Sequence, residues 1–133
     1  MSKLYRVDMK LDTSKLTPNG GMLMKAVDKE VDKRGFKENT GAEVFALISG
    51  VAINGANPKC SHGQLKSFRK IIDDMNKAAA KGEFIGNKTD LDIIKNSIRG
   101  NPGWPNQDEI LGVLDAIIDK IDTAELINEN PSS

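Results

Sequence analysis

The spacing of apolar side chains along the chain predicts mostly helices. A helix is predicted over 22–34, because apolar residues recur there at every fourth position between charged ones. These positions are Leu23, Val27 and Val31. An Asn-Gly pair shortly before this segment is also typical of a hairpin turn, which would make 22–27 a strand instead. Both alternatives stay open for this part of the chain.

The segment 41–53 is apolar on all sides, which is typical of a buried helix. Thr40 and Glu43 have the spacing of a capping box, in which each side chain accepts from a backbone amide at the start of a helix. The segment is also rich in β-branched residues, so a buried strand is the alternative. We expect a helix that ends at the Asn-Gly pair 54–55.

Three further helices are predicted after it. Ser61 and Gln64 form a second capping box, opening a helix over 61–80 whose expected core face is Leu65, Phe68, Ile72, Met75 and Ala79. A shorter helix is expected between a Thr89 cap and Gly100. Asn106 and Glu109 begin the last helix, with an expected core face of Ile110, Leu111, Leu114, Ile117, Ile118 and Ile121.

The N-terminal residues 5–11 alternate strictly between apolar and charged side chains, which predicts a half-buried strand. A lone strand is not stable, so it needs a partner strand from this chain or from a second copy. The fold class is therefore predicted as mainly α, a compact bundle of four to five helices with a small N-terminal β element. An α+β fold is the alternative.

Length and composition fit one globular domain over 1–127, followed by a frayed tail at 128–133. The chain has 133 residues, of which 38% are hydrophobic and 29% charged. Cys60 is the only cysteine, which rules out an intrachain disulfide and favours a reducing compartment, the cytoplasm. No secretion signal and no apolar run of membrane-spanning length is expected.

Equal numbers of basic and acidic residues, 19 each, hide a strong asymmetry along the chain. Residues 1–105 hold 18 basic and 12 acidic side chains, whereas 106–133 hold 1 basic and 7 acidic. At about 100° per residue, a basic stripe lies opposite the core face of the 61–80 helix. It comprises Lys66, Arg69, Lys70, Lys77 and Lys81. An acidic stripe on the last helix comprises Asp108, Asp115, Asp119 and Asp122. These stripes are either ordinary solvated faces or recognition surfaces.

Trp104 lies in a loop framed by Pro102 and Pro105. Prolines restrict the backbone, and tryptophan is enriched at binding hot spots, so we expect a protein contact here. The alternative is that this single tryptophan folds back as a lid on the core.

Other chemistry has weak support. Cys60 and His62 stand at a helix start but have no evident third catalytic residue, and two ligands do not make a zinc site. We expect no cofactor and no metal. The leading hypothesis is a small non-enzymatic interaction protein that binds a protein partner or self-assembles. It would be an accessory factor or inhibitor of bacterial or phage type. A nucleic-acid-binding module using the 61–80 helix is the alternative, and a small Cys/His enzyme comes third.

Overall fold

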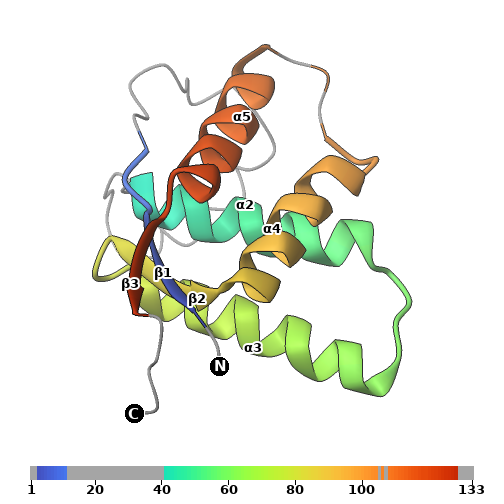
Figure 1. Cartoon of the computed structure of the whole chain (residues 1–133). Coiled ribbons are helices and arrows are strands. Elements are labelled where there is room, and N and C mark those ends of the chain that lie inside the picture. Colours follow the sequence, from blue (N-terminus) through green and yellow to red (C-terminus); the bar gives the residue numbers. More distant parts are fainter. Residues whose placement is uncertain (1–2, 12–40, 105, 107, 129–133) are drawn as a thin grey trace, which may run out of the picture.

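The structure, a computed structural model, describes residues 3–11, 41–104, 106 and 108–128. Within these ranges it contains four helices and one three-stranded antiparallel sheet (Figure 1). A mainly helical fold with a small β element is thereby confirmed, while the narrower expectation of a compact helical bundle stays a prediction. The predicted 22–34 helix and its hairpin alternative lie outside the described residues.

Helix α2, Gly41–Ala56, occupies the centre of the fold and contacts both α3 and α4. The strand alternative for this segment is wrong, and the helix continues beyond the predicted stop at 54–55. Its buried residues are Ala42, Val44, Phe45, Ala46, Ile48, Ser49, Ala52 and Ile53. These side chains are distributed around most of the helix surface, which explains why the sequence of this segment is apolar on nearly every side.

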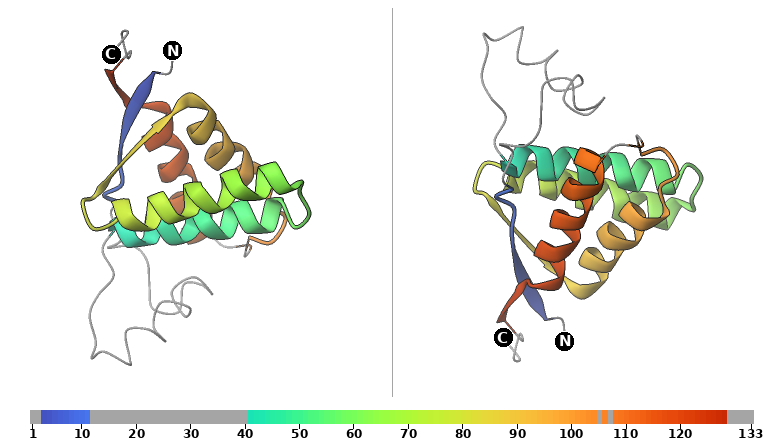
Figure 2. Two further views of the ribbon diagram at one scale, coloured as in Figure 1. Left: turned by 90° about the horizontal axis from the view of Figure 1, so that it is seen from below. Right: turned by 90° about the horizontal axis from the view of Figure 1, so that it is seen from above.

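Helix α3, His62–Ala78, runs beside α2 in the opposite direction (Figure 2). Its predicted start is confirmed, because the Ser61 hydroxyl accepts from Gln64 N at 3.2 Å and the Gln64 side chain accepts from Ser61 N at 3.0 Å. The helix ends two residues before the predicted Ala80. Gly82, at φ 78°, donates its N–H to the Ala78 carbonyl at 3.0 Å and so turns the chain away.

The buried face of α3 differs from the prediction. Leu65 was expected in the core but is 46% exposed, whereas Phe68, Ile71 and Met75 are buried. Helix α3 contacts both α2 and the strand β2 (Glu83–Asn87), so its buried arc is rotated toward Ile71. Periodicity alone does not place the two edges of such an arc.

The sheet has the strand order β2-β1-β3, with β1 (Leu4–Asp8) in the middle and β3 (Glu125–Asn128) on its other side. The predicted N-terminal strand is therefore present, and its partners come from the same chain. It ends earlier than predicted, because the Asp8 carboxylate accepts from the Lys10 backbone N–H at 2.9 Å and bends the chain.

Helix α4, Lys88–Gly100, begins directly after β2. Its cap is Asn87 rather than the predicted Thr89. The Asn87 side chain accepts from Asp90 N at 2.8 Å, and the Asp90 carboxylate accepts from Asn87 N at 3.4 Å. Asn87 thus serves as the last residue of a strand and as the cap of a helix.

Helix α5, Asp108–Asp122, starts two residues after the predicted Asn106 cap and contacts α4 and β1. Four of its predicted core residues, Ile110, Leu114, Ile117 and Ile121, are buried. Leu111 is not, being 58% exposed. Strand β3 follows α5 at once and includes residue 128, where the tail was expected to begin; 129–133 lie outside the described residues. None of the described helices has the length and apolar character needed to cross a bilayer.

Candidate functional site

The four predicted aspartates of α5 share one exposed face, opposite its buried residues. Asp108, Asp115, Asp119 and Asp122 are all exposed. Among the described residues only Asp122 has an ion pair, with Lys95 of α4, whose Nζ lies 2.6 Å from the carboxylate. Lys95 is not part of the predicted basic stripe, and its ion pair neutralises one carboxylate of the four.

Leu111 borders these aspartates. A turn of about 100° per residue puts it 60° from Asp108 on the same side of α5. It is the most exposed large apolar side chain of the described residues. Gly112 also lies on this side, with nothing within 4 Å of the position that a Cβ would take. The surface is therefore acidic with one accessible apolar group; we call Asp108, Asp115, Asp119, Asp122 and Leu111 the acidic face.

The predicted basic residues of α3 (Lys66, Arg69, Lys70, Lys77) and Lys81 after it are exposed. Two carboxylates interrupt them. Asp73 falls within the arc of the lysines, and Asp74 accepts from Lys70 Nζ at 3.0 Å. The Asp74 carboxylate raises the pKa of Lys70 through that hydrogen bond and through its charge. Arg69 donates to the Asn54 side chain at the end of α2. The stripe is thus a mixed-charge surface rather than a purely basic one.

Trp104 is only partly exposed. It is half-buried against the core, and its Nε1 donates to the Ile98 carbonyl at 2.8 Å. Asn101, only 8% exposed, accepts from Gly103 N at 2.8 Å and donates to the Val51 carbonyl at 3.4 Å. These bonds hold the loop against α4 and α2. The geometry therefore matches the lid alternative; Pro102 is exposed, and Pro105 lies outside the described residues.

Cys60 and His62 are both exposed at the start of α3. In the described part of the chain, no three histidine, cysteine, aspartate or glutamate side chains are grouped so that they could hold a metal ion.

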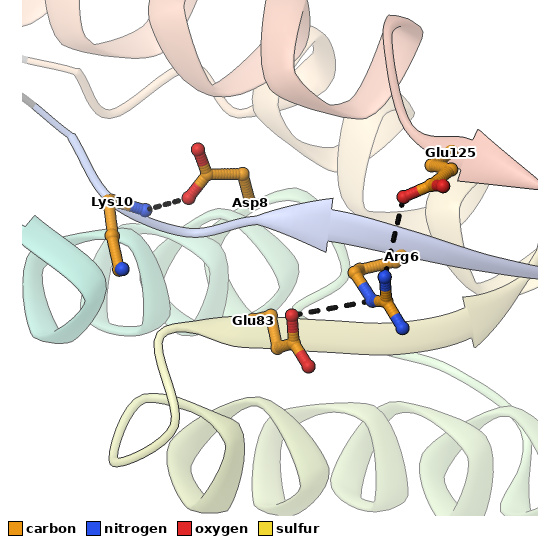
Figure 3. Close-up of polar contacts among 5 residues, drawn as sticks. All are labelled: Arg6, Asp8, Lys10, Glu83 and Glu125. Atoms are coloured by element: carbon orange, nitrogen blue, oxygen red, sulfur yellow. Dashed lines mark hydrogen bonds and ion pairs between the residues drawn. The ribbon is translucent and has the colours of Figure 1, made fainter. Parts of the chain in front are cut away.

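A polar cluster lies on the outer face of the sheet (Figure 3). Arg6 of β1 reaches Glu83 of β2 at 3.3 Å and Glu125 of β3 at 3.4 Å, so one guanidinium links all three strands. Beside it, the pKa of Asp8 is lowered by the hydrogen bond from Lys10 N and then by that from Lys120 Nζ, which lies 3.0 Å away. Since these side chains satisfy one another, the cluster fastens strands and helix together.

A groove that the sequence did not indicate lies where the end of α2, the start of α3 and the second half of α4 meet. Its volume is about 490 Å³. We call it the interhelix groove; its lining residues are Ala56, Asn57, Gly63, Gln64, Ser67, Phe68, Ile93, Asn96, Ser97 and Gly100. Single-sequence patterns did not reveal it, because α2 contributes only one of these residues and α3 and α4 contribute four each.

Comparison with known proteins leaves this geometry as the sole guide to function: no family model, no curated protein and no solved structure matches the chain.

Proposed function

We propose that this chain is a non-enzymatic binding module that attaches to a basic surface of a protein partner through the acidic face of α5. One observation carries the proposal. Three of the four aspartates have no cation partner among the described residues, and the most exposed large apolar side chain, Leu111, lies beside them.

Physical chemistry favours a partner for such a face. Like charges one helical turn apart repel each other by a few tenths of a kcal/mol. A partner that presents Lys or Arg removes that repulsion, and burial of Leu111, which is 58% exposed, adds roughly 1–2 kcal/mol. The aspartates also speed up the diffusional encounter with a basic partner and disfavour binding of acidic ones. In the expected interface, Leu111 therefore makes the apolar contact and the aspartates around it pair with basic side chains of the partner.

The role that fits this module is that of a cytoplasmic accessory factor or inhibitor, of the bacterial or phage type expected from its size. Self-assembly through the acidic face of one copy and α3 of another is the second form of the same proposal. The carboxylates of Asp73 and Asp74 weaken it, because they would face the aspartates of α5. Light scattering across salt concentrations tests it, since such an assembly would dissociate as salt rises.

The direct test uses a fluorescently labelled amphipathic peptide of Lys and Leu as the basic partner. Anisotropy titrations should show binding that weakens with salt and with Asp119→Lys. Asp73→Lys is the matched control, because it makes the same charge change at an exposed position on α3. Equal weakening by the two substitutions would show that only net charge matters and would remove the acidic face from the proposal.

The alternative function, nucleic-acid binding through α3, is favoured by the exposed lysines and opposed by the two carboxylates among them. A mobility shift at low salt that disappears with Lys66→Glu, while the peptide above fails to bind, would favour this alternative. No shift at low salt would exclude it.

A further inference from the structure

We propose that the interhelix groove is a second binding site, which holds a short, uncharged segment of extended polypeptide. This site is separate from the acidic face, since the groove is built from α2, α3 and α4 and includes no residue of α5. Its volume of about 490 Å³ falls in the range of small-ligand sites.

The lining of the groove selects for a neutral ligand. No lysine, arginine, aspartate or glutamate lines it, so neither phosphate nor a metal cation would find a counter-charge. The walls instead carry the amides of Asn57, Gln64 and Asn96 and the hydroxyls of Ser67 and Ser97. Amides donate and accept hydrogen bonds, which matches a peptide group with its N–H and C=O.

Two of these amides are fixed in place before any ligand arrives. Asn57 Nδ2 donates to the Ile53 carbonyl at 2.9 Å and to Ser97 Oγ at 3.3 Å, which leaves the Asn57 carbonyl oxygen as an acceptor. The Gln64 carbonyl oxygen is held by Ser61 N, which leaves the Gln64 NH₂ as a donor. Because their orientation is already set, little side-chain entropy remains to be lost on binding.

The apolar part of the groove suits an aliphatic side chain. Ile93 is half-buried, and Phe68 is only 8% exposed. The phenyl ring of Phe68 therefore exposes too little area for a sugar ring to stack on it. An extended peptide could place one side chain against Ile93 and Phe68 and its backbone between the amides. It would then use both the apolar and the polar part of the groove.

The test is an NMR titration of the full chain with acetyl-Ala-Leu-Ala-methylamide, a short peptide with no charge. We expect saturable shifts of the side-chain amide signals of Asn57, Gln64 and Asn96. Gly63→Phe should abolish them, because Gly63 lines the groove and nothing lies within 4 Å of the position that its Cβ would take. Gly112→Phe is the matched control: it places the same ring at an open helix position outside the groove.

Far-UV circular dichroism establishes that each variant is folded. If Gly63→Phe does not fold, Asn96→Leu is used in its place. This variant should weaken the peptide-induced shifts, because it removes one amide from the groove. The proposal is overturned if the peptide causes no saturable shifts in the wild-type chain, or if the shifts persist in Gly63→Phe. It is overturned equally if inorganic phosphate or methyl glucoside moves these signals and the peptide does not.

Discussion

Gly112, in the middle of α5, makes the folded chain less stable than alanine at that position would. Glycine in a helix interior is about 0.8–1.0 kcal/mol less favourable than alanine. A Cβ added at Gly112 would have no neighbour within 4 Å, so Gly112→Ala gains this propensity with no packing gain and no clash. We expect the free energy of unfolding to rise by about 0.8–1 kcal/mol. With an unfolding entropy of about 2.1 cal/mol/K per residue and 133 residues, Tm rises by roughly 3 °C.

The assay is urea unfolding followed by circular dichroism, with the midpoint increasing and the slope unchanged. Gly86→Ala is the opposite control. Its Cβ would lie 2.7 Å from Cε2 of Phe84, a ring that is 2% exposed and cannot move aside, so we expect a loss of about 1–3 kcal/mol. A lower midpoint for Gly112→Ala would refute the placement of Gly112 on the open side of α5, and a higher one for Gly86→Ala would refute the packing of β2.

Three other changes test the interior, the charges and the loop. Ser49→Ala should raise stability by about 1 kcal/mol in urea unfolding, because the fully buried Ser49 hydroxyl has no hydrogen-bond partner among the described residues; a loss would mean that the hydroxyl is bonded. The folded-state pKa of Asp8 lies below 3.8, so its stabilisation is complete above that pH and is lost as the pH falls through the folded-state pKa. Asp8→Asn should therefore reduce the loss of unfolding free energy below about pH 3.8, by less than about 1 kcal/mol because the pair with Lys120 is largely exposed; an unchanged dependence of stability on pH would contradict this. Trp104→Phe should cost about 1 kcal/mol by removing the hydrogen bond to Ile98, and iodide should quench Trp104 fluorescence weakly; strong quenching would show that the indole is exposed.

Local signals in the sequence predicted the helices well. The Ser61–Gln64 capping box and the apolar run at 41–53 each depend on residues within a few positions of one another, and both correspond to helices. The aspartates of α5 were also placed correctly on an exposed face, since a regular helix fixes the angle between residues. In each case the physics is local, so the pattern was sufficient.

The sheet was only partly predictable, because its pairing joins distant segments. Val7 is paired with Phe84, and Tyr5 with Leu126, more than 75 positions away in each case. Strand β2 has five residues, too few for alternation to be distinctive, and includes Gly86, which weakens any strand prediction. Gly86 is required there because the Phe84 ring occupies the space of a side chain.

The candidate site was predictable in composition but not in orientation. Proline neighbours indicated a restricted loop around Trp104, yet the direction of the indole depends on the Ile98 carbonyl at the end of α4. Leu111 sits at the edge of the apolar arc of α5, where contacts with other elements decide whether a side chain is covered. The interhelix groove exists only through the meeting of three helices, and a single sequence does not encode that meeting in any one segment.

The central position of β1 has a consequence for folding during synthesis. Residues 4–8 are synthesised about 80 residues before their first partner strand, and β3 is made later still. At about 5–20 residues per second, the apolar Val7 and Met9 wait several seconds or more without a partner strand. Pairing of β1 with β2 and β3 is a late step that joins distant segments. We therefore expect formation of this small sheet, rather than of the helices, to limit the folding rate. A chain that stops before residue 125 would expose one whole edge of β1 to pairing with other molecules.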